Sequence, residues 1–215
     1  MLRFRVAIAG IVIALCAAVA CDAGSATPLD RFLEGLASLQ TDFVQQTLNA
    51  SGRKLESGKG QLVVQRPGQF RWEYKANGSA ADGGQLLVAD GRNLWFYERD
   101  LSQVTVRDAR EALSATPITL LSGSSTDVQL AFAVSQLPDR DGLEWVAIVP
   151  RNSAGDFSRA EIGFRGRVLM AMEVTDKLGQ QVQMSFSHTL RNKRVPAAML
   201  TFKVPAGVDQ IGVAR

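Results

Sequence analysis

The sequence has few of the side chains that most often carry metal and acid–base chemistry. Its 215 residues include one histidine, His188, and two cysteines, Cys16 and Cys21. Protein zinc sites usually take three or four ligands, drawn mainly from His and Cys, so this stock excludes a His/Cys metal site of ordinary ligand count. A Ser-His-Asp or Cys-His catalyst would have to use His188.

The sequence also lacks a large excess of charge of one sign. The chain has 24 Lys and Arg against 21 Asp and Glu, and Arg3 and Arg5 precede the first apolar run. Without the first 20 residues, which contain no acidic residue, 22 basic residues oppose 21 acidic ones, a net charge of +1. This balance argues against a nucleic-acid-binding protein. With 46% hydrophobic and 21% charged residues, the composition also excludes a wholly disordered chain and a polytopic membrane protein.

Common catalytic motifs are missing as well. The chain contains no P-loop, GxSxG, HExxH or EF-hand pattern. Asp139 and Asp141 lie in a predicted turn, where aspartate is favoured because its side chain bonds the backbone. His188 falls on the apolar face of an alternating run, and we expect it to be a structural histidine.

The first 20 residues are typical of a secretory signal peptide. A basic start, Met1–Arg5, is followed by the uncharged run Val6–Ala20. This run is shorter than the roughly 20 apolar residues that span a membrane. Because Ala18-Val19-Ala20 fits the A-x-A cleavage pattern, we expect cleavage before Cys21 and export of the mature chain.

Cleavage at this place would leave one domain, residues 21–215, with at most one cysteine and therefore no intramolecular disulfide. A lipoprotein signal with Cys21 as the lipidated residue is the alternative. Ala18 argues against it, because such signals usually carry Leu three residues before the cysteine.

The mature chain begins with a predicted helix. Thr27 is a suitable N-cap, Pro28 suits the first helical position and Asp30 lies in the first turn. The helical spacing of the next large apolar residues predicts one apolar stripe. These residues are Leu29, Phe32, Leu33 and Leu36.

Most of the remaining chain predicts strands. Apolar and polar residues alternate along 69–75, 168–175 and 181–190, which indicates strands with one buried and one solvated face. Turn signals such as Asn77-Gly78 and Asp141-Gly142 separate the runs. We therefore expect about ten strands in a meandering antiparallel sheet, which must curl, close or split.

Two features stand out from this pattern. The segment Ala109–Gly123 is helix-like, with a second cap at Thr116-Pro117. Arg66 precedes Pro67, and its five N–H donors make it either a surface charge or a latch to backbone carbonyls. From these features alone, the helices either complete the core or cover an apolar cavity.

Several motifs together resemble the periplasmic outer-membrane lipoprotein carrier family, LolA. An RPxxFxW string occupies Arg66–Trp72 and a DGxxLWFY string ends at Tyr97, in the family's order and spacing. Further matches are Gly60-Gln61-Leu62, Gln103, Thr116-Pro117 with the following aliphatic residues as the family's lid, and Leu200–Val208 as its closing strand. The resemblance covers about residues 28 to 210.

The resemblance implies a mainly β fold, an incomplete antiparallel barrel of about 10–11 strands closed by an N-terminal helix and short lid helices. It implies a periplasmic chaperone that carries lipoproteins from the inner to the outer membrane, with their acyl chains shielded in a hydrophobic cavity. An inner-membrane ABC transporter would load it, and an outer-membrane lipoprotein receptor would accept the cargo. No cofactor, metal, nucleic acid or enzymatic activity is implied, and we expect a monomer.

We expect the acyl-chain cavity to be lined by residues from the first helix, the early strands and the lid. Taken from periodicity and, for the lid, from the resemblance, these are Leu33, Leu36, Phe70, Trp72, Trp95, Ile118 and Leu121. The resemblance also implies that Arg66 holds the lid shut through backbone carbonyls of the Ala115–Gly123 segment.

Two alternatives differ in kind. The first is a lipid-anchored outer-membrane receptor of the same fold, which lipidation at Cys21 would favour. The second is a periplasmic hydrolase based on carboxylates, which requires two acidic residues facing each other in a pocket.

Overall fold

A computed structural model of the protein describes residues 26–80, 83–113, 118–123, 125–152 and 157–215. The predicted signal segment 1–20, Cys21 and the Thr116-Pro117 cap lie outside the described residues. Within the described ranges, no helix is long and apolar enough to cross a membrane.

The chain forms one small helix and then a long series of strands. The helices are α1 (Pro28–Leu33), α2 (Ala109–Leu113), α3 (Thr119–Ser122) and α4 (Ser125–Ala131). The first six strands are β1 (Ser38–Leu48), β2 (Lys54–Gln65), β3 (Gln69–Ala76), β4 (Gln85–Asp90), β5 (Asn93–Glu98) and β6 (Gln103–Asp108). The last six are β7 (Phe132–Arg140), β8 (Leu143–Pro150), β9 (Phe157–Arg165), β10 (Val168–Asp176), β11 (Gln181–Arg191) and β12 (Asp209–Ile211).

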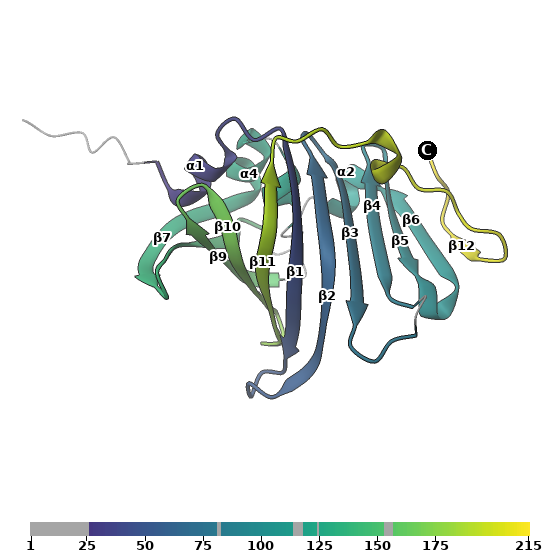
Figure 1. Cartoon of the computed structure of the whole chain (residues 1–215), viewed down its shortest axis with the longest axis horizontal. Coiled ribbons are helices and arrows are strands. Elements are labelled where there is room, and N and C mark those ends of the chain that lie inside the picture. Colours follow the sequence, from purple (N-terminus) through teal and green to yellow (C-terminus); the bar gives the residue numbers. More distant parts are fainter. Residues whose placement is uncertain (1–25, 81–82, 114–117, 124, 153–156) are drawn as a thin grey trace, which may run out of the picture.

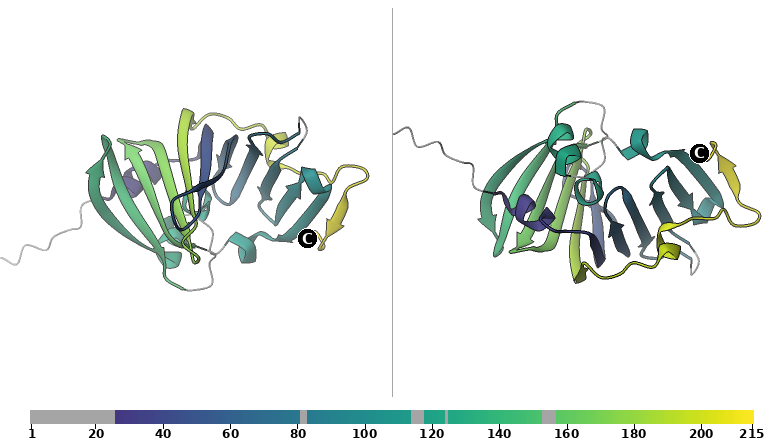
Figure 2. Two further views of the ribbon diagram at one scale, coloured as in Figure 1. Left: turned by 90° about the horizontal axis from the view of Figure 1, so that it is seen from below. Right: turned by 90° about the horizontal axis from the view of Figure 1, so that it is seen from above.

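These twelve strands form a single sheet in the order β12-β6-β5-β4-β3-β2-β1-β11-β10-β9-β8-β7. Neighbouring strands are antiparallel except for the short parallel pair β12–β6. The sheet curls strongly, but its edge strands β7 and β12 lie far apart and it stays open (Figures 1 and 2). The predicted mainly β fold, an incomplete barrel, is confirmed, with twelve strands in place of the expected 10–11.

The N-terminal helix begins where the sequence predicts. Thr27 and Asp30 form a reciprocal capping box: the Thr27 hydroxyl accepts from the Asp30 backbone N–H at 3.2 Å, and the Asp30 carboxylate accepts from the Thr27 backbone N–H at 2.9 Å. The helix is short because Gly35 adopts a left-handed φ of 62°. Leu36 therefore lies beyond the helix rather than on its stripe.

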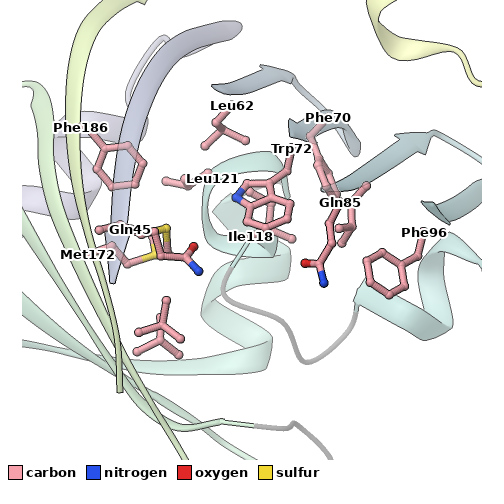
Figure 3. Close-up of a pocket in the computed structure, with 14 residues that line it drawn as sticks. Gln45, Leu62, Phe70, Trp72, Gln85, Phe96, Ile118, Leu121, Met172 and Phe186 are labelled. Carbon is pink, nitrogen blue, oxygen red and sulfur yellow. The ribbon is translucent and has the colours of Figure 1, made fainter. Parts of the chain in front are cut away.

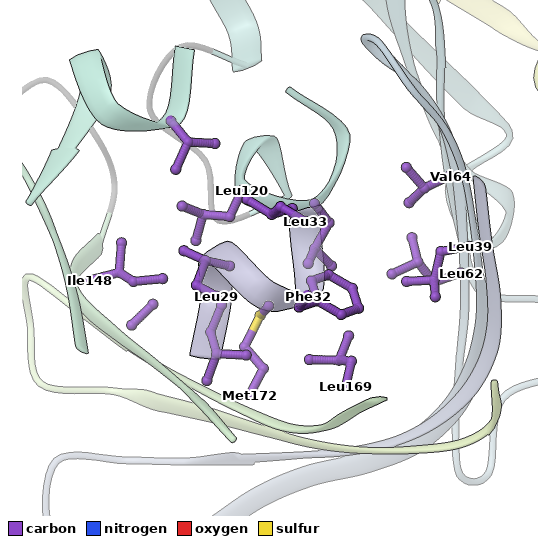
Figure 4. Packing of buried hydrophobic residues seen from close by; sticks show 14 of the residues in the cluster. Leu29, Phe32, Leu33, Leu39, Leu62, Val64, Leu120, Ile148, Leu169 and Met172 are labelled. Atoms are coloured by element: carbon purple, nitrogen blue, oxygen red, sulfur yellow. The ribbon is translucent and has the colours of Figure 1, made fainter. Parts of the chain in front are cut away.

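The core lies between the sheet and these helices. Leu29, Phe32 and Leu33 of α1 are buried against Leu120 of α3 and against strand residues such as Ile148 (Figure 4). The two helical pieces expected within Ala109–Gly123 are present as α2 and α3, whereas the sequence reading did not predict α4.

The end of the chain differs from the expectation. The predicted closing strand Leu200–Val208 is not a strand: residues 201–208 are irregular, and only Asp209–Ile211 pairs with β6. Pro205 has no N–H to give to a ladder, and the Val208 N–H turns back to its carbonyl at 3.4 Å. We call residues 201–208 the C-terminal segment.

The placement predicted for His188 is also wrong. The pairing of β1 with β11 shifts between Gln40↔Leu190 and Asp42↔Ser187, so β11 carries a bulge there. His188 has a left-handed φ of 52°, and its side chain is 82% exposed, with Nδ1 3.0 Å from Asp42 Oδ2. The bulge reverses the alternation, so the imidazole points to solvent instead of toward the apolar side.

Candidate ligand-binding cavity

A cavity of about 410 Å³ lies between the two halves of the curled sheet (Figure 3). Twelve of its fourteen lining residues are apolar. The apolar ones are Leu62, Phe70, Trp72, Leu87, Phe96, Ile118, Leu121, Met172, Val174, Val182, Met184 and Phe186. The size and apolar lining are typical of a site for a hydrophobic small molecule or chain.

Strand alternation positions these side chains. Trp72, Leu87 and Phe96 are paired across β3, β4 and β5, so they form one row on the inner face. On the other half of the sheet, Met172 of β10 pairs with Met184 of β11. The flexible thioethers of these methionines suit a surface that must accommodate variable shapes.

An aromatic stack builds part of the wall near the cavity. The Phe43 and Trp72 rings lie 5.7 Å apart and the Trp72 and Tyr74 rings 5.4 Å apart, both nearly parallel. Strand β2 lies between β1, which carries Phe43, and β3, which carries Trp72 and Tyr74. A Cβ added to Gly58 of β2 would stand 2.7 Å from Tyr74, and a Cβ added to Gly60 would stand 2.4 Å from Phe43. These glycines therefore let the rings lie close over β2.

The short helix α3 closes one part of the cavity. Ile118 and Leu121 point into the cavity, whereas Leu120 is fully buried in the core. The backbone N–H of Gly68 donates to the Ser122 carbonyl at 2.8 Å, which ties α3 to the turn after β2. Since α3 has only four residues, its position depends on such contacts.

Arg66 adds side-chain contacts to this tie. Its Nε and Nη2 donate to the Gly123 carbonyl at 3.0 and 2.6 Å, and its Nη1 donates to the Leu33 carbonyl at 3.2 Å. Partial burial lowers the pKa of Arg66, but a guanidinium stays charged at neutral pH. The side chain thus joins the end of α3 to the end of α1, and Gly123 lies in the predicted carbonyl segment.

A second arginine anchors the same turn of α1. Arg191 donates to the Phe32 carbonyl at 2.6 Å and to the Glu34 carbonyl at 2.5 Å. Positive groups at the carbonyl end of a helix are favourable because the unpaired carbonyls carry partial negative charge. The end of α1, to which Arg66 connects α3, is therefore itself held on the sheet by Arg191.

The structure places the predicted cavity residues in three different environments: the cavity, the main core and the outer face of the sheet. Phe70, Trp72, Ile118 and Leu121 line the cavity. Leu33 and Leu36, each 6% exposed, lie in the main core and not on the lining.

Trp95 lies on the opposite face of the sheet. It belongs to an outer cluster with Leu86, Val88, Val104 and Val106, and its ring packs 5.5 Å from Phe202. The run Leu94–Tyr97 is apolar on both faces, so alternation could not show on which face of the sheet Trp95 lies. A shift of one residue in the assignment reverses the face. Phe96 takes the place expected for Trp95.

Sequence reasoning missed several lining residues. Val174, Val182, Met184 and Phe186 lie in runs that the alternation marks as strands, and assigning those runs to a face of the sheet would have found them. The two polar lining residues, Gln45 and Gln85, carry no such signal.

The cavity offers little for catalysis. Its described lining includes no aspartate or glutamate, so the paired carboxylates that a hydrolase of the alternative kind needs are not on it. Elsewhere in the described ranges, no group of three or more His, Cys, Asp or Glu side chains could hold a metal ion.

Comparison with known proteins identifies the family. The family model described as outer membrane lipoprotein carrier protein LolA matches residues 34–203. The chain belongs to the LolA family. An outer-membrane lipoprotein carrier protein of Methylobacillus flagellatus is 33% identical over 211 residues, covering 98% of this chain and 100% of that protein. One of Methylibium petroleiphilum is 37% identical, covering 92% and 95%.

A solved structure outside these relatives has the same kind of fold. An uncharacterized conserved protein from Thermus thermophilus aligns with a TM-score of 0.50 and 13% identity, covering 86% of this chain and 96% of that one. At this identity the likeness concerns the fold alone. In this LolA family member, the fold places the apolar cavity between the halves of an open curled sheet.

Proposed function

We propose that this protein is a periplasmic chaperone that carries lipoproteins from the inner to the outer membrane. The observation that carries the proposal is the apolar cavity, in which twelve of fourteen lining side chains are apolar. Membership of the carrier family supports it, because the curated relatives are named as outer-membrane lipoprotein carrier proteins. The protein performs no chemistry of its own in this role.

Physical chemistry explains why acyl chains need such a carrier. Each buried methylene gains about 0.8 kcal/mol, so a long acyl chain exposed to water carries a penalty of roughly ten kcal/mol or more. An apolar cavity removes that penalty during transit. Release then requires a moderate net affinity for cargo. A lid that favours the closed state lowers this affinity, because the free energy needed to open the lid is subtracted from the free energy of binding.

We propose that Arg66 supplies this bias. Its guanidinium donates to the carbonyls of Gly123 and Leu33, which belong to the ends of α3 and α1. Hydrogen bonds from a charged donor are worth about 1.5–3 kcal/mol each, enough to hold a four-residue helix without making opening prohibitive. Entry of cargo would break these bonds and displace α3.

The finer parts of the role rest on the sequence and the resemblance. Residues 1–20 direct export, cleavage before Cys21 leaves an unacylated single domain, and the mature monomer moves freely in the periplasm. An inner-membrane ABC transporter loads it, and an outer-membrane lipoprotein receptor removes the cargo.

The test is to express the full chain in a Gram-negative host, purify it from the periplasm and analyse it by mass spectrometry. We expect an intact mass that begins at or near Cys21 without a diacylglyceryl group, together with co-purified lipoproteins. Trp72→Glu, which places a charge on the lining, should recover less lipoprotein at equal yield. A diacylglyceryl adduct on Cys21 would support the receptor alternative, and absence of lipoproteins from wild-type protein would contradict the carrier role.

A further inference from the structure

Two amide side chains interrupt the apolar lining of the cavity, Gln45 from β1 and Gln85 from β4. Both amides point into the open space between the sheet halves (Figure 3). Gln45 is only 9% exposed as a residue. Its side chain forms no hydrogen bond with any residue that the structure describes, although no fully enclosed side-chain N or O atom there is left unpaired. Its amide must therefore meet the space of the cavity.

The neighbouring glutamine shows the ordinary arrangement. Gln46 points to the outer face, is exposed, and donates from Nε2 to Gln183 Oε1 at 2.7 Å. The Gln45 amide instead keeps its two N–H donors and its acceptor oxygen available on the cavity side, because no described residue uses them. A ligand with polar groups at this level could therefore bond to Gln45.

The level of the amides along the strands shows which part of a ligand they would meet. Ser38 of β1 pairs with Gln65, next to Arg66, so that end of β1 lies at the latch. Gln45 is seven residues further along, roughly 23 Å at the usual rise of a strand. Gln85 is the first residue of β4 and pairs with Tyr74, so it also lies toward the end of the strands away from Arg66. The lining between the amides and the latch end is apolar.

We propose that Gln45, with Gln85 across the cavity, binds the carbonyl groups that join the acyl chains to the rest of the cargo. This inference rests on the proposed carrier function. Acyl chains of a lipoprotein end in ester or amide carbonyls, which accept hydrogen bonds, and a glutamine amide offers two N–H donors together with one acceptor oxygen. The hydrocarbon tails then lie toward α3, and the polar junction lies at the two amides. The cavity thereby selects acylated molecules over plain hydrocarbon chains and fixes their orientation.

The test compares two synthetic lipopeptides of equal chain length. Both begin with a cysteine that carries the same N-acyl group and have the same charge. One carries a diacylglyceryl group with two ester carbonyls, and the other carries a dialkylglyceryl group in which ether links replace the esters. Binding is measured by displacement of a hydrocarbon fluorophore. The wild-type protein should prefer the ester peptide by roughly three- to tenfold, as expected for one or two neutral hydrogen bonds.

Variants assign this preference to the amide. Gln45→Met has nearly the same shape and should bind both peptides with equal affinity. Gln46→Met, the matched control on the outer face, should keep the wild-type preference. Because the Gln45 amide makes no hydrogen bond to a described residue, Gln45→Met should unfold at a urea midpoint no lower than that of wild type, whereas loss of a glutamine that bonds the protein would lower the midpoint.

The outcomes separate this inference from the proposed function. Equal affinity of wild-type protein for the two peptides would overturn the inference but leave the carrier role. This comparison uses wild-type protein only, so it does not depend on whether a variant folds. A preference that survives Gln45→Met and Gln85→Met would overturn it too. Failure of both peptides to bind at all would remove the carrier role, and the inference with it.

Discussion

Strands β4 to β6 have an apolar surface on each face, and the two surfaces differ in what covers them. On the outer face, the cluster of Leu86, Val88, Trp95, Val104 and Val106 is covered by the C-terminal segment. Phe202, Val204 and Val208 of that segment pack onto it. On the inner face, Leu87 and Phe96 border the cavity.

The difference shows that apolar strand residues alone do not define a binding site. Adjacent residues, Trp95 and Phe96, have similar chemistry, but one packs against the protein's own chain and the other faces open space. The outer surface is consequently part of the stable fold. The inner surface keeps its apolar area available for a ligand, and its helical cover is held by a few hydrogen bonds.

The largest effect should come from the covered face. Trp95→Ala removes an indole from a residue that is 8% exposed and packs against Phe202, so we expect the free energy of unfolding to fall by about 3–5 kcal/mol in urea denaturation. The affinity of the remaining folded protein for an acyl-chain fluorophore should stay within about twofold. A tenfold loss of affinity at unchanged stability would mean that the two faces are not separate.

Breaking the cover of the inner face should change cargo handling more than it changes the overall stability of the fold. We expect Arg66→Leu to fold and to bind acyl chains at least as well as wild type, but to transfer a labelled lipoprotein to purified receptor about tenfold more slowly, because the closed state loses its charged hydrogen bonds. Arg66→Lys should be intermediate, since an ammonium lacks the planar fork.

The control for this prediction is Arg92→Leu, which changes an exposed arginine and should leave transfer unchanged. Normal transfer by Arg66→Leu would make Arg66 an ordinary structural arginine.

Phe96→Ala is the counterpart of the Trp95 variant one residue away. Phe96 is half-buried and borders the cavity, so its truncation should lower the unfolding free energy by no more than about 1.5 kcal/mol. Affinity for an acyl-chain fluorophore should fall roughly five- to tenfold, as expected for the loss of part of an aromatic contact. The comparison fails if Phe96→Ala and Trp95→Ala have the same ratio of stability loss to affinity loss.

The same pair of residues shows how far the sequence could predict the site. Alternation placed Phe70 and Trp72 on one face, because the polar residue Arg71 stands between them, and both residues line the cavity. It gave no basis for choosing between Trp95 and Phe96, since a strand buried on both faces has no alternation. What decides their roles is a segment more than one hundred residues later, which covers one face only.

Other differences have equally local causes. The bulge in β11 that turns His188 outward inserts one residue into an otherwise regular run, and no residue type in that run predicts the bulge. Leu33 and Leu36 recur at helical spacing in the sequence, but α1 ends at Leu33, and the spacing cannot show whether a residue packs in the core or on the cavity. The Thr27 N-cap and the first-turn Asp30 of α1 form a short motif that the sequence could predict. For Arg66, the carbonyl segment implied by the family resemblance contains Gly123, but the contact with the Leu33 carbonyl was not predicted.

The smallest effect should be the pH dependence of the outer face. The Asp90 carboxylate accepts from the Trp95 indole N–H at 2.8 Å and from the backbone N–H groups of Asn93 and Arg92 at 2.8 and 2.9 Å. Burial by itself raises the pKa of Asp90, but these hydrogen bonds outweigh it and lower the pKa below its ordinary value. A lowered pKa means that the carboxylate stabilises the fold above the unfolded-state pKa of about 3.9, and that this contribution is lost as the pH falls through the folded-state value.

We therefore expect Asp90→Asn to lower the urea midpoint at pH 7, and the difference in midpoint from wild type to disappear as the pH drops below about 4. Asp209→Asn, a change at an exposed aspartate, should leave the urea midpoint at pH 7 unchanged. A gap that stays constant down to about pH 2.5, well below the ordinary aspartate pKa, would show that Asp90 holds Trp95 without its charge. An acid-dependent loss of acyl-chain affinity in folded wild-type protein would instead show that the outer face reaches the cavity.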